Sequence, residues 1–279
     1  MNHAGMTMET ERLVADITFA AIDIETTGLT PVVDSIVEIG AVRFRGDEVL
    51  ETFDELVDPG RSISPGASAV NGITDEMVRG KPTIEEVLPR FITFLGDAVP
   101  AAHHAPFDVS FLAYEISRLN LSVPDKSVLD TCVLPKRLFP HAGSYSLENL
   151  ACFLGIKSET FHRALADAIV CMGILNRCMV EMGGLERVSL SEILDMNGPS
   201  VSLCTGGVVL DPSYMPLQAA IENGHEMEIT YRDARGALSA RTITPLSLGV
   251  SRGAVMMEAF CHLRKGKRNF RLDRIVEIG

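Results

Sequence analysis

An apolar stretch at residues 17–24 (ITFAAIDI) constrains the fold more than any other part of the sequence. It is short, rich in β-branched residues and runs into a Glu-Thr-Thr-Gly sequence, which predicts a buried strand followed by a turn. Because alternate residues of a strand point to one face, Asp23 and Glu25 project side by side from its end. Unpaired acids in apolar surroundings are costly, and hard oxygen ligands suit Mg²⁺ or Mn²⁺. The alternative is a pair of solvated acids at an exposed strand end.

The sequence that follows predicts a sheet domain of the α/β or α+β class. Strands are expected at 36–45 and 48–57, joined by a hairpin-like connection, and a long loop rich in Pro, Gly and Ser is expected over 58–73. Helices are then expected at 83–95, 107–119, 146–154 and 164–182, with a short strand at 98–103. Thr83 and Glu86 are spaced as a capping box at the start of the first of these helices.

The pattern changes after residue 183. Clusters of Gly, Ser and Pro over 184–212 predict a linker with a short helix near 189–194. A small, mostly β domain is expected over 213–279, with a helix at 216–223 and strands at 226–231, 239–244, 254–261 and 274–278. The chain has a net charge of −12, whereas residues 224–279 carry 10 Lys and Arg against 6 Asp and Glu. An acidic body with a basic C-terminal module is a clue to function. An ordinary solvated surface explains the acidity of the first part of the chain equally well.

Composition excludes several classes of protein. At 279 residues the chain is long enough for one large or two modest domains with a proper core. No apolar run approaches the roughly 18 residues of a transmembrane helix, and the N-terminal residues lack the apolar region of a secretory signal, so we expect no membrane partner. The six cysteines form no C-x-x-C pair, which disfavours a disulfide framework and fits a cytoplasmic protein. The net negative charge disfavours a protein that coats nucleic acid through bulk charge.

Two further acids lie at the starts of expected helices. Asp108 falls in the first turn of the helix at 107–119 and Asp167 falls early in the helix at 164–182, where the helix dipole alone would stabilise them. His162 lies five residues before Asp167, which on one helix would place the two side chains about 140° apart. They can converge on one site only if His162 lies in the loop before the helix.

Three segments that carry these acids resemble the motifs of a known family. In chain order they are Asp23–Gly28 (DIETTG), His103–Asp108 (HHAPFD) and His162–Ala168 (HRALADA), and they are similar to the three exonuclease motifs of the DEDDh (DnaQ-like) superfamily. This family includes the epsilon proofreading subunit of bacterial DNA polymerase III. The resemblance implies a ribonuclease H-like domain over 12–183, with a mixed sheet flanked by helices. It also implies metal-dependent 3′→5′ hydrolysis of phosphodiester bonds at nucleic-acid 3′ ends.

The same resemblance implies a role for each motif residue. His162 would be the general base that activates the attacking water. A sister subfamily has Tyr where this chain has Arg163, so the His subtype fits. The residues implied as ligands of two divalent cations, Mg²⁺ or Mn²⁺, are Asp23, Glu25, Asp108 and Asp167. The residues implied in substrate binding are Thr26, Gly28, Asn71, His103 and Phe107.

One position departs from the family pattern. The family usually has Asn between the His and the Ala of the second motif, where this chain has His104. Consecutive His103 and His104 suggest zinc, but neighbouring residues point apart and no Cys or His partner lies at ligand spacing. We therefore expect no zinc site.

Residues 213–279 resemble a WYL domain. The similar segments include Met227–Arg232, Pro245-Leu246 and 258–275, and Val255-Met256-Met257 stands where that family has its Trp-Tyr-Leu. The resemblance implies an Sm-like β-barrel that binds nucleic acid or nucleotides. The basic residues implied in binding, whose guanidinium groups suit phosphate, are Arg264, Arg268, Arg271 and Arg274. Alternatively, the last two of these pair with Asp273 or Glu277 on a solvated edge.

These observations predict a metal-dependent 3′→5′ exonuclease that removes mononucleotides from a nucleic-acid end, DNA in preference to RNA. The expected partner is a single-stranded or frayed 3′ end, and a DNA polymerase or repair complex is a candidate protein partner. Two alternatives remain open at this point. One is a non-catalytic regulator in which a nuclease fold serves a WYL module that senses nucleic acid or nucleotides. The other is an exonuclease of RNA or short oligoribonucleotides.

Overall fold

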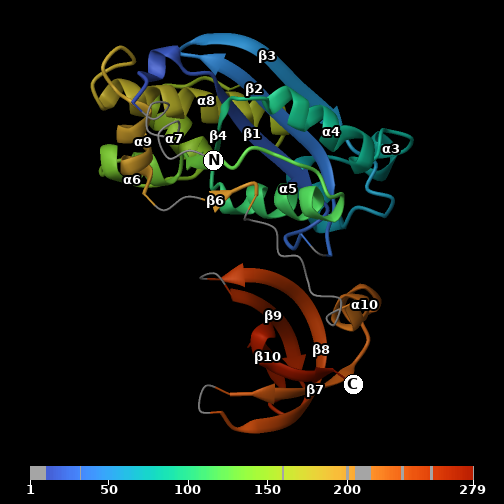
Figure 1. Cartoon of the computed structure of the whole chain (residues 1–279). Helices are drawn as coiled ribbons and strands as arrows, with labels where there is room; N and C mark the ends of the chain where they lie inside the picture. Colours follow the sequence, from blue (N-terminus) through green and yellow to red (C-terminus); the bar gives the residue numbers. More distant parts are fainter. Residues whose placement is uncertain are drawn as a thin grey trace. The chain divides into compact units, whose positions relative to one another are not determined.

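The computed structural model describes residues 11–279 apart from Val32, Glu159, Gly279 and the segments 199–200, 205–214, 234–235 and 252–253. The chain forms two compact units (Figure 1). The larger unit contains most of the chain up to residue 207, and the smaller unit contains residues 208–279.

A six-stranded mixed sheet forms the centre of the larger unit, with the strand order β3-β2-β1-β4-β5-β6. The strands are β1 (Phe19–Thr26), β2 (Ile36–Arg45), β3 (Glu48–Leu56), β4 (Val99–Ala102), β5 (Ser127–Asp130) and β6 (Val201–Ser202). β1 is antiparallel to β2 and parallel to β4. The strands expected from the sequence are confirmed as β1 to β4. The sequence does not predict β5 and β6, which are four and two residues long.

Helices flank this sheet and follow the apolar periodicity of the sequence. They are α2 (Pro65–Asn71), α3 (Asp75–Val78), α4 (Ile84–Leu95), α5 (Pro106–Arg118), α6 (Val133–Leu138), α7 (Leu147–Leu154), α8 (Ala164–Glu181) and α9 (Leu190–Asn197), preceded by a 3-10 turn at Val14–Asp16. The four helices expected at 83–95, 107–119, 146–154 and 164–182 are confirmed as α4, α5, α7 and α8. The capping box of α4 is also confirmed, since the Glu86 carboxylate accepts the backbone N–H of Thr83 at 2.9 Å.

Two apolar cores lie on opposite faces of the sheet. One packs α8 and α7 against Phe19 and Ala21 of β1, and the other packs α4 and α5 against the even-numbered residues of that strand (Figure 1). Burying each large apolar side chain contributes about 1.5–3 kcal/mol to folding. Because side chains alternate along a strand, Asp23 and Glu25 lie on the face of β1 that is covered by α8.

The expectation of a loop throughout 58–73 is wrong, because this segment contains helix α2. The Ser64 hydroxyl accepts the N–H of Ala67, Pro65 occupies the first turn, and Gly72 ends the helix at a φ of 70°. Ser before Pro and a Gly at the end are the signals of a short helix. The high local content of Pro, Gly and Ser concealed them.

The segment expected as a linker, 184–212, is described only as far as Cys204 and without 199–200. Up to that point it packs in the larger unit, where Val188, Leu190 and Ile193 are buried in the core beside α8. The helix expected near 189–194 is α9, which begins with a capping box between Ser189 and Glu192. The Gly and Ser residues of the segment therefore mark the turns around a packed helix.

The smaller unit contains helix α10 (Met215–Asn223) and an antiparallel sheet of order β10-β9-β8-β7-β11. The strands are β7 (Met227–Arg232), β8 (Leu238–Ser251), β9 (Ala254–Cys261), β10 (Gly266–Arg271) and β11 (Ile275–Ile278). The helix and the four expected strands are confirmed. The basic stretch before the last strand forms β10, where Phe270 is buried opposite Met257 while most of its neighbours are exposed.

Within the described residues, no helix combines the length and the apolar character needed to cross a membrane. All six cysteines, which lie in the described part of the chain, are free thiols.

Candidate metal centre

Three carboxylates meet where β1 ends and α8 begins. Asp23 and Glu25 project from β1, Asp167 projects from the first turn of α8, and one ligand oxygen of each lies within 4.8 Å of the others. Asp167 is buried, whereas Asp23 and Glu25 are partly exposed. As the alternation of side chains along a strand predicts, both β1 acids point toward α8, which holds Asp167.

The close packing of α8 on β2 makes this meeting possible. A Cβ atom on Gly40 would lie 2.1 Å from the carbonyl carbon of Ala164 and 2.1 Å from the backbone nitrogen of Leu165. Only a residue without a side chain permits the first turn of α8 to lie this close to the strand. Gly40 is paired with Asp23 across the two strands, so the same approach brings Asp167 to the β1 carboxylates.

Asp108 reaches the same strand end from the first turn of α5. It is 3% exposed, and its Oδ1 accepts the backbone N–H of Ile24 at 3.0 Å. Ile24 lies between Asp23 and Glu25, so α5 contacts β1 within the carboxylate cluster. Among the described residues, the set of atoms within 4.8 Å of one another does not include Asp108.

Burial is the main cause of a raised pKa at all four acids. It raises the pKa of Asp23 well above its usual range, with the Asp108 charge as the next cause. It raises the pKa of Glu25 to about 7 and that of Asp167 to about 6, and Asp167 adds to the shift of Glu25. The pKa of Asp108 is raised to about 8. Without a cation, the four acids therefore resist becoming charged together.

A hard divalent cation fits this set of donors. Among the described residues, Oδ1 of Asp167 is buried without a hydrogen-bond partner, whereas its Oδ2 accepts the backbone N–H of His162 at 3.0 Å. A buried acceptor without a partner costs free energy, and a bound cation removes that cost. All donors are carboxylate oxygens, which Mg²⁺ and Mn²⁺ prefer.

His162 lies in the loop before α8, as its spacing from Asp167 requires. Its backbone adopts a φ of 63°, which is uncommon for a residue with a side chain. The side chain is 54% exposed, and its Nε2 lies 3.4 Å from Oε1 of Glu148 on α7. The backbone of His162 therefore supports Asp167 while its imidazole remains accessible.

The two histidines of the second motif have different environments. The His103 ring is half-buried, with Nδ1 3.0 Å from the Thr131 hydroxyl and Nε2 3.1 Å from the Tyr145 carbonyl oxygen, and burial lowers its pKa. His104 has a φ of 63°, and its N–H donates to the buried Asp130 carboxylate. Asn and His are both among the residues that adopt a positive φ more readily than others, so His104 keeps a backbone conformation that the Asn usual in the resembled family also adopts readily.

The other residues expected in substrate binding border the carboxylates or the core. Asn71 is buried, its amide donates to the Thr26 carbonyl oxygen at 3.4 Å, and a hydrogen bond from its side chain lowers the pKa of Glu25. A Cβ on Gly28 would meet the Asp34 carboxylate. Phe107 packs 5.2 Å from the ring of Phe111. Their roles toward a substrate remain predictions.

The basic residues expected in the C-terminal domain fall into two groups. Arg264 lies in the β9–β10 turn and Arg268 lies on β10, and both are exposed. Arg271 instead forms a two-pronged contact with Asp273, at 3.0 and 2.7 Å, which is the alternative that the sequence left open. Arg274 lies partly exposed at the end of the turn before β11.

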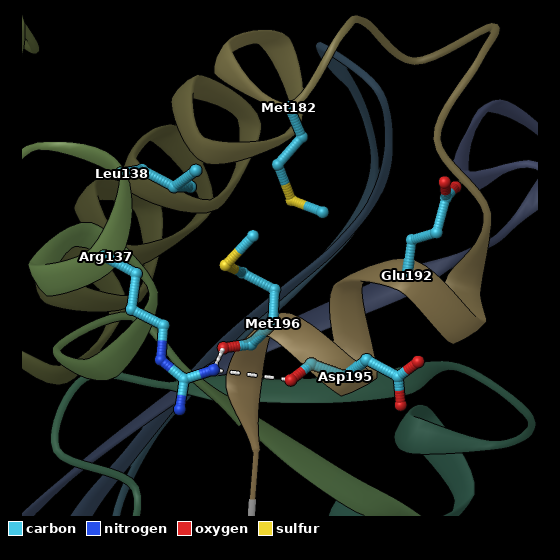
Figure 2. A pocket seen from close by; sticks show the side chains of 6 residues that line it. All are labelled: Arg137, Leu138, Met182, Glu192, Asp195 and Met196. Carbon is cyan, nitrogen blue, oxygen red and sulfur yellow. Dashed lines mark hydrogen bonds between the residues drawn. The ribbon is translucent and has the colours of Figure 1, made fainter.

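A pocket away from the carboxylates is formed by α6, α9 and the end of α8 (Figure 2). It is lined by Arg137, Leu138, Met182, Glu192, Asp195 and Met196. The Arg137 guanidinium donates to the backbone carbonyl oxygens of Asp195 and Met196, which lie near the end of α9 (Figure 2). Arg137 therefore acts as a cap of α9, and the pocket shares none of its lining with the carboxylate cluster.

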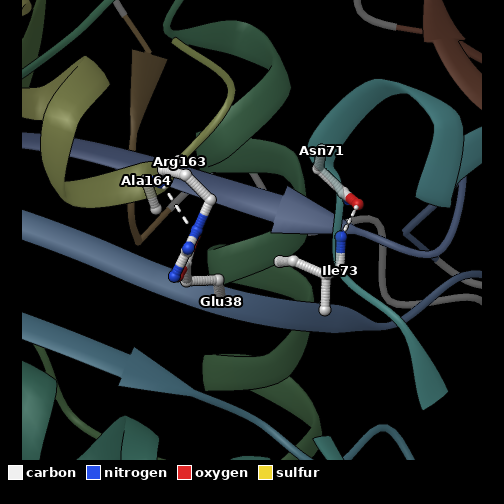
Figure 3. A network of polar contacts seen from close by, with 5 residues as sticks. All are labelled: Glu38, Asn71, Ile73, Arg163 and Ala164. Carbon is white, nitrogen blue, oxygen red and sulfur yellow. Dashed lines mark hydrogen bonds and ion pairs between the residues drawn. The ribbon is translucent and has the colours of Figure 1, made fainter. Parts of the chain in front are cut away.

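Sequence reasoning missed Glu38, a fully buried acid of β2 that contacts both Arg163 and Ala164 (Figure 3). The sequence signal for a buried, partnered acid was a single Glu within the apolar stretch IVEIGAV. Its partners follow more than a hundred residues later, so no local pattern identifies them.

Comparison with known proteins identifies two families. The Exonuclease family (RNase_T) matches residues 20–175, and the WYL domain family matches residues 212–279. The DNA polymerase III PolC-type of Thermotoga maritima is 40% identical over 181 residues, which are 65% of this chain and 13% of that protein. The PolC-type polymerase of Caldanaerobacter subterraneus is 39% identical over 175 residues, or 63% of this chain and 12% of its own length. The chain therefore spans about one eighth of these relatives.

Solved structures share the fold of the larger unit. Exonuclease X in complex with 5′-overhanging duplex DNA is 31% identical, with a TM-score of 0.52, and the match covers 64% of this chain and 99% of that one. Escherichia coli exonuclease I in complex with a dT13 oligonucleotide is 20% identical, with a TM-score of 0.56, and covers 88% of this chain and 55% of its own. At that identity the second match supports the fold alone.

Proposed function

Because the chain belongs to the Exonuclease family (RNase_T) and carries a C-terminal WYL domain, we propose that it is a metal-dependent 3′→5′ exonuclease that shortens DNA from its 3′ end. The observation that carries the proposal is the carboxylate cluster. Asp23, Glu25 and Asp167 converge to within 4.8 Å, and Asp167 retains a buried oxygen without a partner among the described residues.

The proposed ligands of two Mg²⁺ or Mn²⁺ ions are Asp23, Glu25, Asp108 and Asp167. When bound, such ions make water a stronger nucleophile and neutralise charge on the phosphate and on the leaving oxygen. The protein supplies the fixed positions of the carboxylates: Asp108 is held by the N–H of Ile24 and Asp167 by the N–H of His162.

His162 is the proposed general base. Its imidazole accepts the proton of the attacking water as that oxygen bonds to phosphorus, and the bond from phosphorus to the 3′-oxygen of the preceding nucleotide breaks. The products are a 5′-mononucleotide and a chain shortened by one residue. Glu148 lies 3.4 Å from Nε2, so it orients the ring and stabilises the imidazolium that forms.

The proposed substrate is a single-stranded or frayed 3′ end, contacted by Thr26, Gly28, Asn71, His103 and Phe107. DNA is favoured because exonuclease X is solved with DNA and the PolC-type relatives are DNA polymerases. The latter relationship also supports a role in replication or repair beside a polymerase, including proofreading. A 3′-exonuclease solved with a histone mRNA stem-loop shares the fold at 19% identity, so RNA is the substrate to test in parallel.

We further propose an exonuclease domain over 12–183, to which the expected linker 184–212 adds the packed helix α9, and a WYL domain over 213–279, whose antiparallel sheet forms an Sm-like barrel. The exposed guanidinium groups of Arg264 and Arg268 support phosphate binding by this domain. Arg271 and Arg274 are the other two arginines proposed to bind phosphate. Arg271 should contribute less, because its guanidinium already contacts Asp273.

The experiment compares single-stranded DNA labelled at its 3′ end with the same DNA labelled at its 5′ end, in Mn²⁺ or Mg²⁺. A 3′→5′ exonuclease releases the 3′ label as a mononucleotide and converts the 5′-labelled strand into a ladder. Asp167→Ala should abolish both signals, and a matched RNA digest tests the alternative substrate. Binding without turnover in either metal would instead support the non-catalytic regulator.

A further inference from the structure

A buried Glu–Arg contact joins the sheet to the loop that carries His162. Glu38 lies on β2 directly opposite Glu25 of β1, and its side chain is 1% exposed. The Arg163 guanidinium donates from Nε to Oε1 at 3.0 Å and to Oε2 at 3.2 Å, and from Nη2 to Oε1 at 2.5 Å. The backbone N–H of Ala164, the first residue of α8, donates to Oε2 at 2.9 Å (Figure 3).

Stability alone does not call for a Glu at this place. Its charge is one of the causes that raise the pKa of Asp23 and Glu25, so it adds a fifth acid to a crowded cluster. Apolar residues of similar volume are often at least as stabilising as a buried ion pair. The advantage of a Glu here is therefore geometric, because one carboxylate holds a side chain and a backbone group at once.

Gly40 completes this geometry. Glu38 and Gly40 are two residues apart on β2, so they share a face, and both touch the start of α8. Glu38 holds the N–H of Ala164 while the absence of a side chain at Gly40 admits the backbone of Ala164 and Leu165. The first turn of α8, which carries Asp167, is thus fixed against the sheet at two points.

We propose that Glu38 and Arg163 are a positioning pair, which sets the loop of His162 and the first turn of α8 relative to the carboxylates of β1. Neither residue acts on the substrate. The pair determines where Asp167 and His162 lie, and reacting groups displaced by about 1 Å lose on the order of 100-fold in rate. This inference rests on the proposed exonuclease function of the same site.

The test uses the full-length protein and Glu38→Gln, with Arg163→Lys as a second variant that keeps the charge but loses the planar fork. Each is compared in Mn²⁺ binding by calorimetry, in kcat and KM on a single-stranded oligonucleotide, and in hydrogen exchange of the segment 160–168. Glu51→Gln is the matched control. Glu51 also pairs with an arginine of β2, Arg43 at 3.2 Å, but its own side chain is 56% exposed and it lies outside the carboxylate cluster.

For Glu38→Gln we expect kcat to fall about 10- to 100-fold and the affinity for Mn²⁺ to weaken about 10-fold, with KM within about twofold of its original value. Exchange in the segment 160–168 should accelerate. The Arg163 side chain is 42% exposed, so Arg163→Lys should fold normally. Its losses in kcat and in Mn²⁺ affinity should be about 3- to 10-fold smaller than those of Glu38→Gln. Glu51→Gln should leave every value unchanged.

The outcomes distinguish failure of the positioning pair from failure of the proposed exonuclease function. If Asp167→Ala abolishes digestion and Mn²⁺ binding but Glu38→Gln and Arg163→Lys match the unaltered protein, the positioning pair is refuted and the proposed function stands. If Asp167→Ala itself binds Mn²⁺ and digests DNA normally, the proposed function fails. A fall in thermal stability with unchanged kcat in the variants also refutes positioning, because it leaves the pair only a structural role.

Discussion

The carboxylate of Asp108 accepts the backbone N–H of Ile24 at 3.0 Å, and Ile24 lies between Asp23 and Glu25. A helix on one face of the sheet is thereby tied to a strand whose acids point to the other face. The contact holds Asp108 at the end of β1 without using all of its acceptor capacity, since an ionised carboxylate has two oxygens.

Asp108→Asn keeps the hydrogen bond to Ile24 but removes the negative charge of Asp108, so it separates the effects of the two. The amide oxygen of Asn can still accept the N–H of Ile24, so the fold should persist. Removal of one acid from a repelling cluster should raise the metal-free melting temperature. Digestion should fall at least about 100-fold, because the negative oxygen for the cation is lost. Melting curves and single-turnover digestion measure the two effects.

Asp58→Asn is the control for this prediction. Asp58 also accepts backbone N–H groups, from Gly60 at 3.0 Å and from Gly80 at 3.1 Å, but lies outside the cluster. Its replacement should leave digestion unchanged. Full activity of Asp108→Asn would contradict the role given to Asp108.

The raised pKa values of the acids predict how metal-free stability depends on pH. The folded-state pKa is about 7 for Glu25, about 8 for Asp108 and about 6 for Asp167, whereas the unfolded values are near 4. The folded chain therefore binds more protons than the unfolded chain between about pH 4 and pH 8, and its stability falls as the pH rises through that window. Melting temperatures measured in a chelator should decline over this range.

Mn²⁺ should reverse that decline, with its largest stabilisation at the alkaline end where the carboxyls have released their protons. In Asp108→Asn, the melting temperature in chelator should fall less steeply with pH than in the unaltered protein. A metal-free melting temperature that rises from pH 5 to pH 8 would contradict the electrostatic account of the cluster.

Gly40→Ala tests the close approach of α8 to β2. The added methyl group would meet backbone atoms at 2.1 Å, so the helix must move, at a cost of about 1–3 kcal/mol in the free energy of unfolding. Digestion should fall with it, since Asp167 moves away from the β1 acids. Denaturant unfolding and initial rates measure these changes.

Gly66→Ala is the matched substitution. A Cβ at this position of α2 meets nothing closer than the Ser64 hydroxyl at 4.0 Å, and Ala favours a helix more than Gly does. It should be neutral or slightly stabilising. Equal behaviour of the two variants would show that the contact at Gly40 is not a constraint.

The C-terminal arginines should differ in their effect on nucleic-acid binding. Arg264→Ala and Arg268→Ala should each weaken the binding of single-stranded DNA and reduce the dependence of log affinity on log salt by about 1. Arg271→Ala should change binding less, because Asp273 already holds its guanidinium. Fluorescence anisotropy at several salt concentrations makes the comparison, in the Asp167→Ala background, which is expected not to digest the probe. An equal loss in all three variants would contradict this ranking.

The sequence was sufficient to predict the parts of the fold that have strong periodicity. The apolar stretch of β1, the presence of helix α8 and the position of His162 before that helix all follow from local patterns. It was insufficient for α2, whose Ser64 cap and Gly72 end were hidden in a segment rich in loop-forming residues. The basic stretch of β10 also gave no strand pattern, because only Phe270 faces the core fully.

Tertiary contacts explain what local patterns could not show at the site. Glu38 looks like an isolated acid in a strand until Arg163, 125 residues later, is placed beside it. In the same way, the two hydrogen bonds of the His103 ring come from Thr131 and Tyr145, which no spacing rule connects to it. The acids proposed as cation ligands follow from motifs, whereas the residues that position those acids follow only from the fold.

Anomalous diffraction from crystals grown with Mn²⁺ would locate bound cations relative to the four acids. We expect two Mn²⁺ peaks among the carboxylate oxygens of Asp23, Glu25, Asp108 and Asp167. Crystals that contain Mn²⁺ elsewhere, or that show no peak at these four side chains, would contradict this expectation.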